Sequence, residues 1–164
     1  MLEVLPARLT DGPEILELWT GAARWIQAKG INQWHPDEFN LAQTEQLIMD
    51  RELEFFVAKT DGIIIGTLYI CWSDPVVWGE LNDAASSGYI HRFAVKRSHL
   101  GQGVGRELLL WAEDYIRIKG KKQIRLDCMA DNERLNQYYV TSGYIHKKLL
   151  HWDNGWKINL YEKE

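Results

Sequence analysis

The spacing of apolar residues along the chain predicts helices first and then strands alternating with helices. Apolar side chains recur at helical intervals over Thr10–Gly30, where Asp11 can cap the first turn and Glu14 can close a capping box. The same periodicity predicts helices over 41–51, 103–119 and 132–141. Runs rich in β-branched and aromatic residues predict strands over 54–59, 63–72, 88–95, 123–129, 144–150 and 156–161.

The connections between these segments indicate how the strands are joined. An Asp61-Gly62 dipeptide between the first two strands is a strong hairpin signal, whereas residues 73–87 are expected to form an irregular insertion. Early hairpin pairing followed by a strand–helix–strand crossing predicts an α/β fold with a mixed sheet. No repeat or linker divides the sequence, so we expect residues 1–164 to form a single domain.

Composition and charge argue against a nucleic-acid-binding protein and against a membrane protein. Hydrophobic residues make up 46% of the chain and charged residues 26%, which is typical of a globular protein. The net charge is −4 without a long basic run, and no apolar run approaches the roughly 20 residues that span a bilayer. We therefore expect a cytoplasmic protein with neither a nucleic acid nor a membrane as partner. Cys71 and Cys128 are predicted to be buried thiols in a reducing compartment, and no metal is expected.

Three alternating glycines stand directly before the predicted helix 103–119, in the run HLGQGVGR of residues 99–106. Glycine lets a backbone turn sharply and approach a ligand, and the free N–H groups at a helix start bind anions. The dinucleotide fingerprint needs a glycine where Leu108 stands, and the P-loop needs Gly-Lys-Ser/Thr where this chain has Gly-Arg-Glu. A phosphate-binding loop of another kind is therefore predicted, with a plain tight turn as the alternative.

The run YIHRFAVKRSHLGQGVGRELL, followed by LDCMADNERLNQYYVTSGY, resembles the GCN5-related N-acetyltransferase (GNAT) superfamily over about residues 88–144. The resemblance implies an acyl-CoA N-acyltransferase fold: a mostly antiparallel sheet with a splayed parallel strand pair, flanked by helices. The splayed pair would be 88–95 and 123–129. The resemblance also implies acetyl-CoA as co-substrate and a tendency to form homodimers.

The resemblance further implies how the cofactor is held. Main-chain groups of 93–95 would pair with the pantetheine arm, amides of 101–105 would hold the pyrophosphate, and Asn132 would bond to the pantetheine. Leu100 stands where the family usually has Arg or Gln, so backbone groups must carry most of the binding there, with help from Arg97, Gln102 or Arg106. The expected cofactor-binding residues are Phe93, Ala94, Val95, Leu100, Gly101, Gln102, Gly103, Val104, Gly105, Arg106, Asn132 and Tyr138.

Two residues are assigned to proton transfer. Tyr139 matches the family tyrosine that protonates the departing thiolate, with Tyr138 as its nearest rival. His91, on the strand that would border the thioester, is the candidate base, acting directly or through water, because histidine side chains ordinarily exchange protons near neutral pH. A purely structural histidine is the alternative, and Glu80 and Asp83 are rival carboxylates.

The chain is rich in tryptophan, with eight in total. Aromatic faces attract cations, so an aromatic pocket for an amine is one interpretation and ordinary core packing is the other. We therefore expect an N-acetyltransferase that moves an acetyl group directly to the primary amine of a small molecule. A protein or peptide N-acetyltransferase and a non-catalytic CoA-binding regulatory module remain alternatives. The expected acceptor-binding residues are Trp25, Trp34, Trp78 and Glu80, and His35, Asp37, Glu38 and Asp83 are further candidates.

Overall fold

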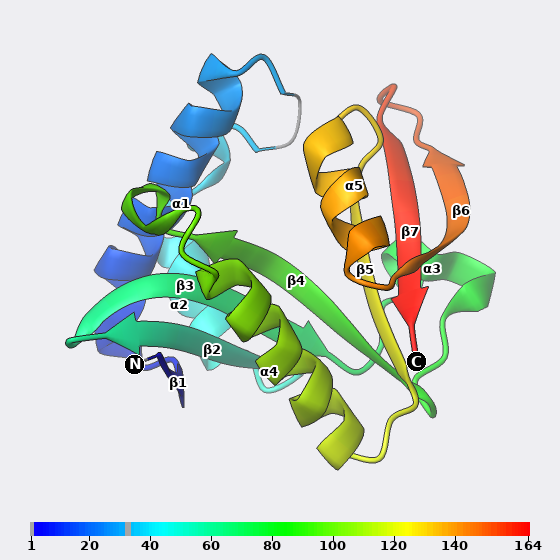
Figure 1. The fold of residues 1–164 in the computed structure, drawn as a ribbon, viewed down its shortest axis with the longest axis horizontal. Helices are drawn as coiled ribbons and strands as arrows, with labels where there is room; N and C mark the ends of the chain where they lie inside the picture. The colour runs from blue at the N-terminus through cyan, green and yellow to red at the C-terminus, as the bar shows by residue number, and fades with distance from the viewer. Residues whose placement is uncertain (1, 32–33) are drawn as a thin grey trace.

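The computed structural model describes residues 2–31 and 34–164. It forms one seven-stranded mixed sheet in the order β1-β2-β3-β4-β5-β7-β6, flanked by helices (Figure 1). Within the described residues, no helix is long and apolar enough to cross a membrane. The strands are β1 (Glu3–Pro6), β2 (Leu53–Thr60), β3 (Ile63–Cys71), β4 (Ser87–Val95), β5 (Gln123–Met129), β6 (Ile145–His151) and β7 (Lys157–Lys163). The helices are α1 (Gly12–Ala28), α2 (Leu41–Met49), α3 (Pro75–Trp78), α4 (Val104–Ile118) and α5 (Glu133–Thr141).

The predicted mixed α/β fold and its main elements are confirmed, with local corrections. Strand β1 was missed because its four residues are too short for a pattern, and the 73–87 insertion contains the short helix α3. The predicted capping box at α1 is wrong. The Asp11 carboxylate accepts from the Arg8 backbone N–H at 2.8 Å, and Glu14 accepts from the Ile64 N–H at 2.7 Å, which ties α1 to β3.

The two faces of the sheet carry separate hydrophobic cores. Helix α1 packs Ile15 and Trp19 against β2 and β3, and α4 packs Leu108 and Ile116 against the other face. A Cβ at Gly88 would lie 2.8 Å from Ile116, so glycine there lets α4 sit close to β4. Both cysteines are free thiols; Cys128 is buried as predicted, whereas Cys71 is only half-buried, contrary to the prediction.

The parallel strands β4 and β5 separate after a short paired stretch. They pair only over Ser87–Tyr89 and Gln123–Arg125, although both strands continue well beyond these residues (Figure 1). The second half of β4 therefore has an edge with backbone N–H and C=O groups that β5 does not pair. This confirms the splayed strand pair, and it opens the sheet at the place where the site forms.

Candidate functional site

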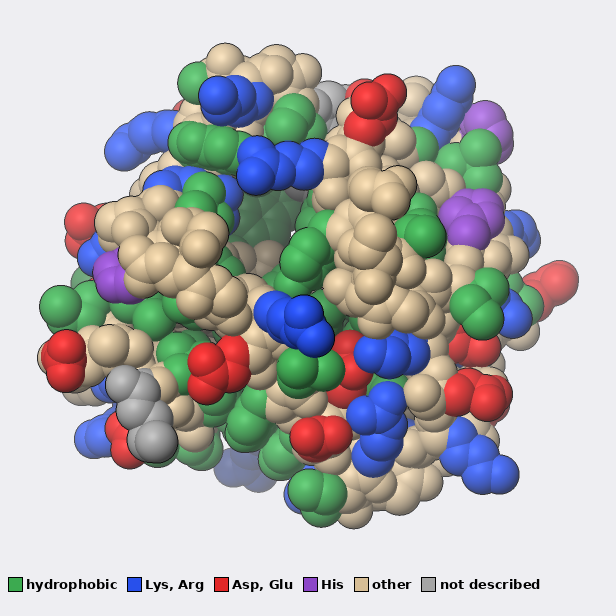
Figure 2. Space-filling model, viewed as in Figure 1, with side chains coloured by type: hydrophobic (Ala, Val, Ile, Leu, Met, Phe, Trp, Pro, Cys, Tyr) green, Lys and Arg blue, Asp and Glu red, His purple; other side chains and the backbone are tan. Residues whose placement is uncertain are grey.

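A cavity of about 560 Å³ opens where β4 ends, between the C-terminal half of α1, the start of α4 and α5. Figure 2 shows the surface hollowed over this region, with hydrophobic side chains inside and basic side chains at the rim. Eleven of the twelve predicted cofactor-binding residues line it, and Gln102 alone does not. The lining residues from the prediction are Phe93, Ala94, Val95, Leu100, Gly101, Gly103, Val104, Gly105, Arg106, Asn132 and Tyr138.

The glycine loop has the backbone geometry of an anion site. Gly101 and Gly103 have φ angles of 78° and 79°, in the left-handed region that favours glycine, and Gly103 caps α4. Because the first N–H groups of a helix have no internal partner, the start of α4 offers donors and a positive dipole end to this cavity. Leu100 is 41% exposed beside it and supplies no donor from its side chain.

Basic side chains reinforce this end of the cavity. Arg97, Arg106 and Arg134 all line it. The Arg97 guanidinium is fixed by bonds to the Val95 carbonyl, at 2.6 Å from Nη2 and 3.1 Å from Nε. Burial, and then repulsion by Arg134, lowers the pKa of Arg97. An anion bound here would relieve that repulsion, so the charges as well as the backbone suit a polyphosphate.

Asn132 lies on the α5 side of the same cavity. Its side-chain oxygen accepts from the Leu135 N–H at 3.2 Å and caps α5, which leaves the NH₂ group of the amide available to a ligand. Tyr138 packs its ring against Phe93, and its hydroxyl is buried without a hydrogen-bond partner. Asn132 and Tyr138 thus present polar atoms toward the open edge of β4.

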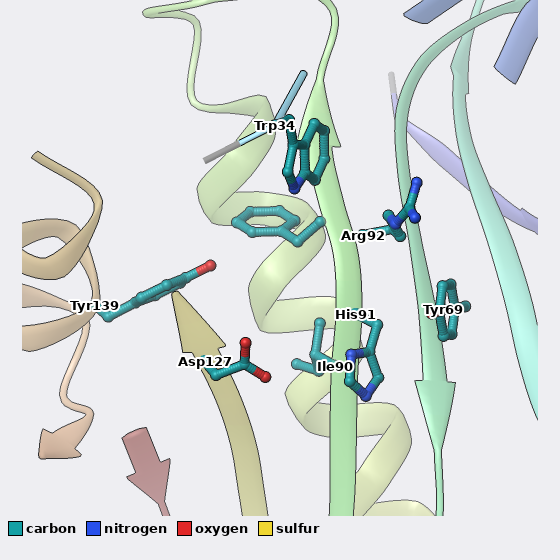
Figure 3. Close-up of a pocket in the computed structure, with 8 residues that line it drawn as sticks. Trp34, Tyr69, Ile90, His91, Arg92, Asp127 and Tyr139 are labelled. Carbon is teal, nitrogen blue, oxygen red and sulfur yellow. The ribbon is translucent and has the colours of Figure 1, made fainter. Parts of the chain in front are cut away.

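A second cavity, of about 190 Å³, adjoins the first and shares Trp34 and Phe93 with it. We call the first the cofactor cavity and the second the acceptor cavity. In Figure 3, Asp127 of β5 and Tyr139 of α5 project across the gap toward β4, which carries His91. The acceptor cavity is lined by Trp34, Tyr69, Ile90, His91, Arg92, Phe93, Asp127 and Tyr139.

Acidic groups surround His91. Its Nε2 lies 3.3 Å from Asp74 Oδ2, and its ring stacks on Tyr69 with the centroids 5.2 Å apart. Asp127 also lines the cavity. Burial is the main cause that raises the pKa of its carboxyl to about 6; His91 lowers that pKa and Asp74 raises it. Asp74, His91 and Asp127 each offer one ligand atom within 4.8 Å of the others, close enough for a metal ion to bridge.

Tyr139 is 4% exposed, and its hydroxyl group lies on the acceptor cavity (Figure 3). Burial is the main cause that raises the pKa of Tyr139 well above 10, and the nearby Cys128, Asp127 and Tyr138 add to the shift. The phenol therefore stays protonated at neutral pH, as a proton donor must.

The remaining predicted acceptor residues divide between the cavities and other parts of the molecule. Trp25 and Trp34 line the cofactor cavity, and Trp34 also borders the acceptor cavity. Trp78 is 2% exposed and packs in the core, with the Arg125 guanidinium 4.4 Å from its ring centre. Glu80 is exposed and lines neither cavity. Asn32 and Gln33, which precede Trp34 in the chain, lie outside the described residues.

Asp74, Asp127, Arg92 and Tyr69 are the site residues that the sequence interpretation missed. Asp127 had a usable signal, because it is the one acidic residue inside an otherwise strand-like run, QIRLDCM. The others had none, since their roles depend on how β3, β4 and the α3 segment meet in space.

Comparisons with known proteins identify the family and agree with the fold. The sequence model of the Acetyltransferase (GNAT) family matches residues 15–144. An uncharacterized N-acetyltransferase, YesJ of Bacillus subtilis, is 33% identical over 148 residues, which cover 85% of this chain and 79% of YesJ. A GNAT-family acetyltransferase structure from Listeria monocytogenes has a TM-score of 0.79 and 30% identity, covering 99% of this chain and 94% of its own.

The PaiA N-acetyltransferase of Thermoplasma acidophilum, solved with coenzyme A, has the same fold at 20% identity. Its TM-score is 0.76, and the match covers 100% of this chain and 99% of PaiA. The family match and the relatives together show the class of enzyme as well as the fold. The chain belongs to the GNAT family and is an N-acetyltransferase.

Proposed function

We propose that this protein transfers the acetyl group of acetyl-CoA directly to the primary amine of a small molecule. The observation that carries the proposal is the meeting of two cavities at the unpaired edge of β4. The cofactor cavity has the shape and charge for an extended polyphosphate thioester, and the acceptor cavity holds His91 and Tyr139 at the junction.

Acetyl-CoA fits the cofactor cavity part by part. Its pantetheine arm can pair with the open backbone of 93–95 as an added strand, because β5 has diverged from β4 there. Its pyrophosphate fits the start of α4, where glycine N–H groups and Arg106 converge. The similar PaiA structure holds coenzyme A, which supports the same class of ligand here.

His91 is the proposed base. Asp74 lies at ion-pair distance from Nε2 and favours a proton on that nitrogen, which leaves Nδ1 of the neutral ring as a proton acceptor. Nδ1 takes a proton from the ammonium of the acceptor, directly or through a water molecule. The freed amine lone pair then attacks the thioester carbonyl carbon.

Tyr139 completes the reaction. A backbone N–H of Phe93 or Ala94 stabilises the negative charge that develops on the carbonyl oxygen. As the C–S bond breaks, the electron pair goes to sulfur, and the phenol of Tyr139 gives its proton to the departing thiolate. The nitrogen, which became cationic on attack, loses its second proton to solvent as the amide forms. The tyrosinate then recovers a proton from solvent, and the His91 imidazolium releases its proton to solvent. Each such proton transfer contributes about 10²- to 10⁴-fold to a rate.

The acceptor cavity favours a small molecule over a protein. Its volume of about 190 Å³ is enclosed by side chains of β3, β4, β5, α5 and Trp34. A peptide acceptor needs an open groove, and a regulatory module without catalysis would have no need for a protonated phenol beside a histidine. We therefore rank both alternatives below the small-molecule enzyme.

The test is a reaction of the purified chain with acetyl-CoA and a panel of small amines and short peptides. Thiol release and the mass of the acetylated product are measured together. Acetylated small amines are the expected result, and transfer to peptides alone, or to nothing, would contradict it. The rates should be unchanged after treatment with EDTA; a loss that zinc or another divalent ion restores would make Asp74, His91 and Asp127 a metal site.

A further inference from the structure

Arg92 sits at a break in the regular geometry of β4. The register between β3 and β4 shifts at this point, and Arg92 adopts a φ of 49°, which is unfavourable for a non-glycine residue. Neighbouring side chains of a strand normally point to opposite faces. The bulge changes that direction, and the consecutive residues His91 and Arg92 both line the acceptor cavity.

Among the described residues, the guanidinium of Arg92 contacts aromatic rings and has no carboxylate partner. Its guanidinium lies 4.6 Å from the ring centre of Phe39 and 4.9 Å from that of Trp19. Across residues 2–31 and 34–164, no carboxylate comes within 4.0 Å of it, and its Nη1 is buried without an acceptor. Burial is the main cause that lowers the pKa of Arg92; Tyr69 and the exposed Glu38 act against it. Charges held away from solvent are normally paired, so this guanidinium is suited to bind an anionic group of a ligand.

The rest of the acceptor cavity has the opposite character. Asp127 lines it, and His91 lies 3.3 Å from Asp74. These acidic groups suit an acceptor that arrives as an ammonium ion and must lose a proton. The lining of the cavity thus combines acidic groups near the proposed base with the cationic Arg92, which Figure 3 shows on the β3 side of β4.

We propose that the acceptor carries an anionic group, such as a carboxylate, beside its primary amine, and that Arg92 binds this group. An α-amino acid is the simplest member of the class. The inference rests on the proposed function and specifies the chemical class of the acceptor. A polyamine is disfavoured because its second cation would meet the Arg92 guanidinium.

The test uses acceptors that differ only in the anion: leucine against leucinamide and 3-methylbutylamine, and phenylalanine against phenylalaninamide and phenethylamine. The kcat/KM of the carboxylate form should exceed that of its amide by roughly 10- to 100-fold, the effect of one charged hydrogen-bonded pair. In Arg92→Met this ratio should fall toward one. Arg24→Met, which removes an exposed arginine of α1 that lines neither cavity, should keep the wild-type ratio.

The ratio distinguishes recognition from a structural role. If Arg92 only packed against the aromatic rings, Arg92→Met would lower activity on both acceptors equally, and the inference would be overturned. Plain amines accepted as well as amino acids would overturn it too, while leaving the proposed function intact. Absence of transfer to every amine tested would instead remove the proposed function, and the inference with it.

Discussion

The cofactor cavity and the acceptor cavity touch each other, yet they are built in different ways. The cofactor cavity takes half of its lining residues from the stretch 93–106, where left-handed glycines and the start of α4 offer main-chain donors, and most of the others from α1 and α5. The acceptor cavity takes four consecutive residues from the irregular part of β4 and single side chains from β3, β5, α5 and the segment before α2. The cofactor cavity depends mainly on backbone conformation, whereas the acceptor cavity depends on charged side chains that are held partly away from solvent.

This difference has an energetic consequence. Every helix start has free backbone N–H groups, so a cofactor site made from them needs little that opposes folding. The unfavourable positions are the left-handed residues such as Gly101 and Gly103. The acceptor cavity holds a raised carboxyl pKa at Asp127 and an unpartnered cation at Arg92, and both oppose folding. Substitutions in the acceptor cavity should therefore lower activity while keeping or raising stability. Those in the cofactor loop should change CoA affinity, and they should lower stability where they replace a left-handed glycine.

The largest effect is expected from Tyr139→Phe. Loss of the phenolic proton should lower kcat by about 100-fold or more, because general acid catalysis contributes on that scale. The affinity for CoA, measured by calorimetry, should stay within about two-fold of the wild type, since Tyr139 faces the acceptor cavity. Tyr138→Phe is the matched control in the cofactor cavity. A larger fall in kcat for Tyr138→Phe would exchange the roles of the two tyrosines.

The next largest effect is expected on the free energy of unfolding, when Asp127 is replaced by asparagine. Its pKa of about 6 when folded lies above its usual value, so the folded state binds the proton more tightly and stability falls as pH rises from about 4 to 6. Two pKa units correspond to about 3 kcal/mol. Asp127→Asn should therefore be more stable than the wild type at pH 7 by up to about that amount, with the gain disappearing below pH 4, while acetyl transfer declines.

Urea unfolding at pH 7 and pH 4 measures the stability difference for Asp127→Asn. The exposed neighbour provides the control, since Asp131→Asn should change stability little at either pH. If Asp127→Asn were less stable than the wild type at pH 7, the ionised carboxylate of the wild type would have to stabilise the folded state. The contrast between the two cavities would then weaken.

The same contrast explains what the sequence could predict. The cofactor cavity follows from a local pattern: glycines at 101 and 103 adopt the left-handed conformation that the loop requires, and the helix start comes next in the chain. A spacing along the chain is enough to predict the glycine loop, and its residues line the cofactor cavity except Gln102. Phe93–Val95, Asn132 and Tyr138 were assigned through the family resemblance, and they line the same cavity.

The acceptor cavity could be predicted only in part. His91 and Tyr139 were found through their places in the family pattern, but Asp74 reaches His91 from an insertion whose course no periodicity specifies. Arg92 faces the cavity because of a bulge, which the alternation of β4 does not reveal. The sequence around Trp78 does not indicate whether this residue lines a pocket or packs in the core. The structure shows that it packs in the core.

A third prediction concerns Gly105→Ala in the cofactor loop, which should raise stability but lower the affinity for CoA. Its φ lies outside the left-handed region, and a Cβ there would meet Val95, Phe93 and Tyr138 only at 3.5 to 3.7 Å. Gly105→Ala should thus raise the stability of α4 by up to about 1 kcal/mol. The methyl group points into the cofactor cavity, so the affinity for CoA should fall by roughly ten-fold, on the scale of about 1–2 kcal/mol for a crowded contact.

Thermal unfolding and calorimetry with CoA measure the two effects at Gly105. Gly101→Ala is the comparison, because its φ of 78° makes any side chain unfavourable and the variant should lose stability by about 1–2 kcal/mol. If Gly105→Ala bound CoA as tightly as the wild type, the pyrophosphate would have to lie elsewhere in the cavity.

The smallest effect is expected at Leu100, where the family usually has Arg or Gln. Because backbone groups, Arg97 and Arg106 are already proposed to bind the phosphates, Leu100→Arg should tighten CoA binding by only about two- to five-fold at low salt, the range of an exposed ion pair. The gain should shrink as salt screens the charge. Leu110→Arg adds the same charge at a 45% exposed site on α4 outside the cofactor cavity. An equal gain from Leu110→Arg would show that net charge, and not the loop position, strengthens binding.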